Sequence, residues 1–271
     1  MPGFDQFPMA VDPEVLTVFL LFAGVGFLAQ IVDGALGMAY GVISTTVLLA
    51  FGVPPATASA SVHAAEVFTT GVSGVSHISH KNVDWRAFAF LAPAGMIGGV
   101  AGAYVLSGIE GDQIRPFVIA YLALLGVFIL VRAFRKLELS HINLRLTPPL
   151  GLVGGFLDAV GGGGWGPMVS STLMGSGATP RTVIGTVNTA EFFVTCAISA
   201  GFVWALLTGH WAEAGELTDH LPAVAGLIAG GLCAAPLAGY VVKMAHPRLL
   251  TVAVGLLVVG LSVWQGVQLW G

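Results

Sequence analysis

Charged residues are scarce in this chain. Asp, Glu, Lys and Arg make up 9% of its 271 residues, whereas a soluble domain carries about 25%. Hydrophobic residues make up 56%, and the mean hydropathy is +0.89. A helix of about 20 apolar residues spans a bilayer, and uncharged runs of that length recur at 15–32, 87–107, 221–242 and 249–270. The composition excludes a soluble domain and predicts an all-α polytopic membrane protein.

Basic residues are missing from the N-terminus, and cysteines are few. The first 14 residues, MPGFDQFPMAVDPE, hold no Lys or Arg, so they lack the basic region that opens a cleavable signal peptide. We therefore expect the first apolar segment to be retained. Cys196 and Cys233 have no partner spacing and lie in apolar segments, which favours small buried hydrophobes over redox or metal work. We expect no metal site, no cofactor and no nucleic-acid partner.

The sequence repeats itself at an offset of 125 residues, with 26–70 overlaying 151–195 without a gap. Chance aligns hydrophobic residues readily, but it rarely aligns acids, glycines and a proline in one frame. The matched pairs are Asp33 with Asp158, Gly37 with Gly162, Gly41 with Gly166, Pro55 with Pro180, and Glu66 with Glu191. The pattern indicates an internal duplication.

Each half reads as five hydrophobic segments, and the polar stretch KLELSHINLR (136–145) links the halves. The segments are expected near 14–33, 37–52, 55–79, 86–107 and 114–135, then near 147–159, 164–178, 180–208, 220–243 and 248–269. The predicted division is a first repeat at 1–135, a cytoplasmic linker at 136–146 and a second repeat at 147–271, all within one integral membrane unit.

The basic residues predict the orientation, because cytoplasmic loops are enriched in Lys and Arg. They gather after the third segment, around the central link and in the ninth loop: Lys81, Arg86, Arg132, Arg135, Lys136, Arg145, Lys243 and Arg248. The other loops are acidic, and Arg115 lies against the trend. Both termini are therefore expected outside. An odd number of crossings inverts the second half, as in secondary transporters whose substrate site lies between two inverted repeats.

The glycine run 161–164 interrupts the sixth segment close to its acidic residue. Asp158 lies 12 residues beyond Leu146, or about 18 Å at 1.5 Å per residue, just past the middle of a core about 30 Å thick. Only 11 residues then lead from Gly166 to Gly177. Two short arms with both ends on one side fit either a re-entrant hairpin or two tilted crossings, and their shortness favours the hairpin.

Four carboxylates are expected near the membrane midplane: Asp33, Glu66, Asp158 and Glu191. No Lys or Arg lies inside the apolar segments to neutralise them, and an ionised carboxylate in hydrocarbon is costly. Glu66 and Glu191 therefore either carry protons during transport or tie helices together as neutral hydrogen-bonding groups. Asp33 and Asp158 each precede a helix start, so they either cap that helix or take part directly in proton or substrate binding.

Polar neighbours share the helix faces of the two glutamates. His63 and Thr70 flank Glu66 at i−3 and i+4, and the repeat places Asn188 and Thr195 around Glu191. A histidine at this position either relays protons or donates to an anion, or it is a hydrogen-bonded structural residue.

The glycine breaks predict an anion site. Unwound backbone inside a membrane must be satisfied by protein, water or ligand, and helices that begin there present free N–H groups. The glycines are Gly37 and Gly41 in the first copy, and Gly162, Gly163 and Gly164 in the second. Hydroxyls follow each break: Ser44, Thr45 and Thr46, then Ser170, Ser171 and Thr172. The alternative is that the glycines permit close packing and the hydroxyls bond to their own helices.

The stretches DGALGMAYGVISTTVLL and DAVGGGGWGPMVSSTLM resemble the paired motifs of the TauE/SafE sulfite exporter family. The second copy is the better match. In the first, Leu36, Met38 and Ala39 replace glycines and Val42 replaces the proline. The resemblance covers nearly the whole length and implies a multi-pass transporter in the bacterial inner membrane, carrying sulfite or organosulfonates such as sulfoacetate. It also implies proton coupling.

The leading hypothesis is therefore a proton-coupled secondary transporter that exports a small sulfur oxyanion. A passive anion channel for the same substrates is the alternative, although a simple pore does not need buried acids. An intramembrane enzyme is not expected, because the serine in GSG at 175–177 has no histidine in a partner position. Which anion is carried, the direction, the stoichiometry and any homo-oligomer are left open by the sequence.

Overall fold

The computed structural model describes residues 12–134, 142–175, 178–212, 220–244 and 247–270. Its elements in chain order are α1 (Pro13–Leu36), α2 (Tyr40–Ala50), α3 (Pro55–Ser79), α4 (Trp85–Ser107), α5 (Gly111–Arg132), α6 (Thr147–Gly161), the π-helical turn η1 (Gly166–Ser170), α7 (Ser171–Gly175), α8 (Pro180–Leu207), α9 (Leu221–Met244) and α10 (Pro247–Trp270). Prolines begin α1, α3, α8 and α10, because the first turn of a helix has N–H groups without intrahelical acceptors, so nothing is lost when a proline removes one.

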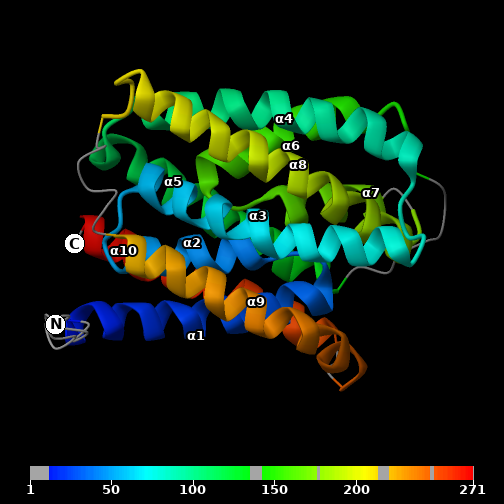
Figure 1. The fold of residues 1–271 in the computed structure, drawn as a ribbon, viewed down its shortest axis with the longest axis horizontal. Coiled ribbons are helices and arrows are strands. Elements are labelled where there is room, and N and C mark those ends of the chain that lie inside the picture. The colour runs from blue at the N-terminus through cyan, green and yellow to red at the C-terminus, as the bar shows by residue number, and fades with distance from the viewer. Residues whose placement is uncertain (1–11, 135–141, 176–177, 213–219, 245–246, 271) are drawn as a thin grey trace, which may run out of the picture.

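The long helices run side by side along the long axis of the molecule (Figure 1). Helices of one half pack on helices of the other: α1 on α9, α4 on α6 and α8, α3 on α8, and α5 on α10. The two halves are therefore interleaved, and neither forms a separate body with its own core.

The described helices make a multi-pass membrane protein. α1, α4, α5, α8 and α10 each hold a window long and apolar enough to cross a bilayer. Large apolar side chains cover the outside, as in Phe117 and Leu207, which are 71% and 79% exposed. Small polar residues such as Ser44 and Thr57 are fully buried instead. This pattern suits a lipid solvent, and it agrees with the predicted all-α polytopic class.

Two short arms give the fold its hairpins. α1 runs most of the way along the bundle, and α2 then returns toward the end where α1 begins (Figure 1). α6 enters from the opposite end, and η1 with α7 returns to that same end, where α8 begins. Each hairpin thus begins and ends at the same end of the bundle (Figure 1). α1 by itself is long and apolar enough to cross a bilayer.

The predicted segments match the helices within a few residues, with two differences. The first helix continues past Asp33 to Leu36, so the acid lies inside its last turn. The segment expected at 164–178 is not one helix: it is the π-helical turn η1 followed by the five-residue α7. Single π-turns occur mostly within helices at functional sites, and here one follows directly after the glycine run.

Glycines bring the paired helices into backbone contact. A Cβ on Gly155 of α6 would strike the carbonyl oxygen of Gly95 on α4, and one on Gly230 of α9 would strike that of Ala23 on α1. Small residues at such crossings are how membrane helices pack closely without a hydrophobic driving force.

Basic residues lie at one end of the bundle. The described ones at that end flank the start or the finish of a helix, and they are Lys81, Arg86, Arg132, Arg145, Arg181, Lys243 and Arg248. Arg135 and Lys136 lie outside the described residues. The first residues of α1 and the last of α10 lie at the opposite end (Figure 1), and there the described basic side chain is Arg115.

The cysteine expectation is wrong in part. Both cysteines are free, but Cys196 is only half-buried and Cys233 is exposed. An apolar thiol is stable on the outer surface of a helix that faces lipid. Cys233 on α9 therefore does not need to be buried in the core.

Candidate functional site

Asp158 holds the second break together through its backbone and its side chain. α6 ends at Gly161, and the next residue, Gly162, has a left-handed φ of 64° and donates its N–H to the Asp158 carbonyl. Gly163, with φ 154°, donates to the same carbonyl at 3.1 Å. The Asp158 carboxylate then accepts from the N–H of Trp165 at 2.9 Å, across the gap to the returning arm. One aspartate thus caps the end of one helix and the start of the next.

Asp33 does the same at the first break. Gly37 is left-handed with φ 66°, and its N–H donates to the Asp33 carbonyl at 2.6 Å. The N–H of Tyr40, the first residue of α2, lies 3.3 Å from the Asp33 carboxylate. Each partner lies 125 residues before its equivalent in the second break. The geometry fits the bracing role that the sequence left open for both aspartates.

Ala39, one of the residues that differ between the two breaks, has a strained backbone. Ala39 has φ 106°, a left-handed conformation that a side chain disfavours and that glycine adopts freely. The repeat places Gly164 at the equivalent position of the second break. Gly164 itself has no positive φ, and in the second break the positive φ values fall on Gly162 and Gly163. The two breaks therefore differ in backbone conformation at this position.

The two returning arms touch where their glycines cross. A Cβ added to Gly41 would lie 2.9 Å from the Gly163 Cα and 2.8 Å from Oε1 of Glu66. The hydroxyl of Thr45 donates to the carbonyl oxygen of Gly162. Only residues without side chains allow two backbones to meet this closely, so the glycines of the two motifs form one crossing.

Buried acids surround this crossing. Glu66 is 3% exposed, and its Oε2 has no hydrogen-bond partner within the described part of the chain. Glu191 on α8 is 9% exposed. The two glutamates lie within electrostatic range of each other and of Asp33 and Asp158. The carboxylates of Asp33, Glu66, Asp158 and Glu191 therefore lie in one region of the molecule.

His63 contacts Asp158 in this region. Its Nε2 lies 3.2 Å from Oδ2 of Asp158, with both side chains buried. Its Nδ1 faces the Ser59 carbonyl oxygen at 2.7 Å, so the ring on α3 is held from both sides. The Ser59 hydroxyl also donates to the Ala159 carbonyl at 2.6 Å. These contacts join the first half of the chain to the second beside the break.

The predicted hydroxyls make different contacts. Thr46 donates to its own helix, at the Val42 carbonyl, while Thr45 donates across the crossing. Ser44 and Ser170 are buried without partners among the described residues. Ser171 is held by a hydrogen bond from Arg132 and belongs to the basic end of the bundle instead. Only part of the predicted hydroxyl set is thus free to bind a ligand.

Asn188 occupies the position that repeats His63, and it makes a different contact. Its Nδ2 donates to the Ser73 hydroxyl at 3.1 Å, and its Oδ1 has no partner among the residues described. It therefore links α8 to α3 but does not pair with an aspartate. The two halves of the site are chemically unequal.

The chain is similar to proteins of a known transporter family. The family model for the sulfite exporter TauE/SafE matches residues 22–265. The chain belongs to the TauE/SafE family. The probable membrane transporter protein YtnM of Bacillus subtilis (strain 168) is 46% identical over 243 residues, which cover 87% of this chain and 78% of that protein. No solved structure matches the chain.

This TauE/SafE member is a membrane transporter, and its fold contains a site residue that the sequence did not single out. Tyr121 of α5 points its hydroxyl at the second break, 3.4 Å from the Gly163 carbonyl oxygen and 3.8 Å from the Met168 sulfur. A Cβ on Gly164 would strike this hydroxyl. A lone tyrosine in an apolar segment carries no pattern, so only the packing of α5 against the break reveals it.

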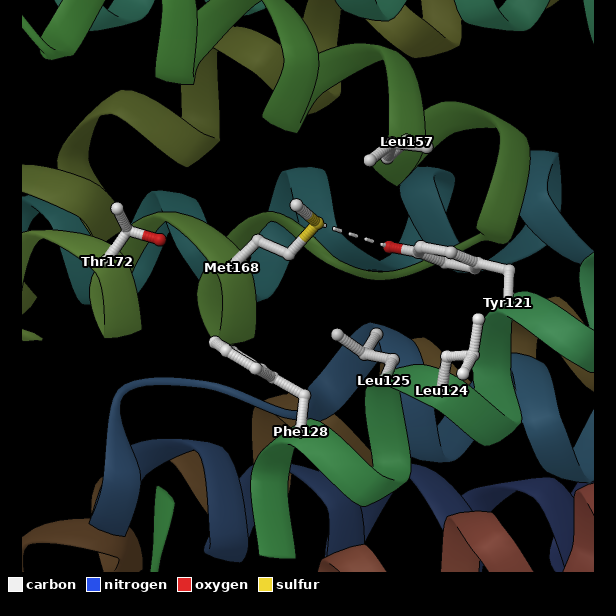
Figure 2. Close-up of a pocket in the computed structure, with 7 residues that line it drawn as sticks. All are labelled: Tyr121, Leu124, Leu125, Phe128, Leu157, Met168 and Thr172. Atoms are coloured by element: carbon white, nitrogen blue, oxygen red, sulfur yellow. Dashed lines mark hydrogen bonds between the residues drawn. The ribbon is translucent and has the colours of Figure 1, made fainter. Parts of the chain in front are cut away.

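An apolar cavity of about 250 Å³ adjoins this tyrosine (Figure 2). Tyr121 and Met168 meet across its middle, and Leu157 and Phe128 close its sides. Thr172, predicted to follow the second break, lines the end of the cavity that is far from Tyr121. The cavity thus lies beside the second break and is lined by residues of α5, α6, η1 and α7.

Proposed function

We propose that this protein is a proton-coupled secondary transporter that exports a small sulfur oxyanion, sulfite or an organosulfonate such as sulfoacetate, across the bacterial inner membrane. The observation that carries the proposal is the contact of two glycine breaks, Gly41 against Gly163, beside the buried carboxyl group of Glu66. Family membership supports the substrate class.

The anion would be held by backbone and hydroxyl groups when the arms part. The first N–H groups of α2 have no intrahelical acceptors, and helix N-termini favour negative charge. Ser44 and Ser170 add buried hydroxyls that lack partners among the described residues. This set can hold an oxyanion without a fixed positive charge, so the anion can also leave.

Protons would be carried by the glutamates. An ionised carboxylate without a cationic partner is costly in this setting, so Glu66 is expected to be neutral while the arms are in contact. Opening toward water would let it exchange its proton. Glu191 occupies the repeated position and is expected to do the same as access alternates to the other side.

A carrier is favoured over a passive channel because the arms meet backbone to backbone at Gly41 and Gly163. A carrier needs such a closed contact between its two open states. The position of the basic residues at one end of the bundle supports a cytoplasmic location for that end, with α1 beginning and α10 ending outside.

The deciding experiment is anion flux in proteoliposomes. Wild-type protein is expected to move sulfite or sulfoacetate faster under an imposed pH gradient than without one. Glu66→Gln and Glu191→Gln are expected to lose that acceleration, because a glutamine cannot carry a proton. Glu14→Gln, at an exposed position in the first turn of α1, is the matched control and should behave as wild type.

Two results would overturn parts of the proposal. Flux that ignores both the pH gradient and the two glutamine variants would remove proton coupling. Single-protein conductance far above carrier turnover would replace the carrier with the channel.

A further inference from the structure

Arg115 departs from the distribution of the other basic residues. It lies on α5 at the end of the bundle where α1 begins and α10 finishes, whereas the other described Lys and Arg residues lie at the opposite end. The glycine crossing does not use it. Its guanidinium is half-buried, and one N–H donates to the Leu49 carbonyl at the end of α2, at 2.7 Å.

Arg115 lines a polar cavity of about 410 Å³ between α2, α5 and α10. The lining residues are Leu49, Ala50, Asp112, Arg115, Trp264, Gln265, Gln268 and Leu269. A guanidinium has five N–H donors, and only one of those on Arg115 has a partner among the described residues. The cavity therefore contains a positive group with unused donors.

Gln265 is the second polar anchor of the cavity. It is only 5% exposed, and its Nε2 donates to the Thr46 carbonyl at 3.3 Å. The amide nitrogen is used in that contact, whereas the amide oxygen, Oε1, is buried without a partner in the described part of the chain. A buried acceptor without a donor is costly, so it is suited to a ligand that brings an O–H or N–H group.

α2 runs from the crossing to the cavity. Gln265 contacts Thr46, and the neighbouring Thr45 donates to the Gly162 carbonyl. From Thr45 to Leu49 is four residues of helix, or about 6 Å. A ligand leaving the crossing along α2 on this side would reach Arg115 after about one helical turn.

We propose that this cavity is a second anion-binding site of the transporter, in which Arg115 supplies the charge and Gln265 accepts a hydrogen bond from the ligand. The ligand is a small oxyanion that keeps a proton or carries another donor, and hydrogensulfite is the smallest such member of the proposed substrate class. The site rests on the proposed function and adds the place at which the anion is held between the crossing and the water.

Asp112 gives the proposal an electrostatic test. It is exposed, lies at the mouth of the cavity and is three residues from Arg115. No ion pair joins Asp112 to Arg115 among the described residues. Its charge therefore opposes anion entry, and its removal should strengthen binding. If Arg115 had only a structural role, the Arg115 and Asp112 variants would not change anion affinity in opposite directions.

The experiment measures sulfite binding to the purified protein in detergent by calorimetry near neutral pH, where the hydrogensulfite form is present. Arg115→Gln should weaken binding at this site about tenfold or more, because a hydrogen bond to a charged partner is lost. Asp112→Asn should tighten it about two- to fivefold. Gln265→Leu should weaken hydrogensulfite binding but leave binding of fully deprotonated sulfate unchanged.

Arg86→Gln, at an exposed position at the other end of the bundle, is the matched control and should bind as wild type. Arg115→Lys covers the case in which Arg115→Gln unfolds α2, since it keeps the charge and should retain most of the affinity. Thermal melting of each variant separates a folding defect from a binding defect.

Sulfite flux in proteoliposomes distinguishes this site from the function itself. If wild-type protein transports sulfite and none of the Arg115, Asp112 and Gln265 variants alters its affinity, the second site is overturned and the transport proposal stands. If no sulfur anion is transported but the variants shift binding in the stated directions, the site stands and the transport proposal falls.

Discussion

Nε2 of His63 and Oδ2 of Asp158 lie 3.2 Å apart, and both side chains are buried. This contact joins α3 in the first half to α6 in the second, beside the glycine break that Asp158 also caps. The same carboxylate thus serves one helix start and one histidine. Breaking either contact should disturb the other, because both depend on the orientation of a single side chain.

A double-mutant cycle on this pair should show strong coupling. His63→Asn places in α3 the residue that the repeat has at Asn188, and it leaves Asp158 without its histidine partner. Loss of one partner of a buried pair costs about 3–5 kcal/mol, so His63→Asn should unfold at a markedly lower temperature in detergent. Asp158→Asn keeps the acceptor for Trp165 and should restore part of that loss in the double variant. Additive effects of the two changes would contradict the coupling.

Ala39→Gly should stabilise the protein. The alanine is held at φ 106°, and backbone strain of this kind costs about 1–3 kcal/mol. Glycine removes the strain, because it adopts a positive φ freely. The control is Ala120→Gly at an exposed position within α5, where the same exchange should destabilise by about 1 kcal/mol. Equal destabilisation in both variants would show that the first break does not need a glycine here.

Gly41→Ala should impair transport far more than a glycine change elsewhere. The new methyl group would lie 2.8 Å from Oε1 of Glu66 and 2.9 Å from the Gly163 Cα, so the arms would be forced apart. Gly24→Ala is the matched control, since a Cβ there meets nothing within 4 Å. Proteoliposome flux should fall strongly for the first variant and stay at the wild-type rate for the second. Wild-type flux in Gly41→Ala would mean that the arms need not touch.

Tyr121→Phe should separate the hydroxyl from the ring. The hydroxyl lies 3.4 Å from the Gly163 carbonyl oxygen, a long contact whose loss should cost about 0.5–1 kcal/mol of stability. Tyr121→Ala should cost more than Tyr121→Phe, because it removes a partly buried ring and enlarges the cavity beside Met168. Thermal melts of the two variants test this order. A larger loss for Tyr121→Phe would assign the main role to the hydroxyl.

The helices could be predicted from the composition, because a lipid environment allows few other backbone structures. Backbone groups must be satisfied within the segment, so long apolar runs become helices, and the predicted boundaries came within a few residues. The bracing by Asp33 and Asp158 was one of two readings available from their positions before helix starts. The pairing of His63 with Asp158 was not available, because the two residues are 95 positions apart and the repeat gives His63 an asparagine as its equivalent.

Other parts of the site depended on packing between distant segments. Tyr121 and Gln265 show no motif in the sequence, yet α5 brings one to the second break and α10 brings the other to the end of α2. The segment at 164–178 reads as an ordinary apolar run, and it became a π-turn and a short helix. Ser171 was grouped with the site hydroxyls, but Arg132 holds it elsewhere.

By itself, the sequence determined a helical membrane chain with two glycine breaks and four acids in apolar surroundings. Hydropathy is set by neighbouring residues, and the repeat at an offset of 125 residues can be found by aligning the sequence with itself. The tertiary structure alone decided that the two breaks meet at Gly41 and Gly163, and that Arg115 and Gln265 line a common cavity. The physical reason is that glycine lets a backbone approach closely but does not specify its partner. The choice of partner comes from how α1, α3, α5 and α10 pack around the arms.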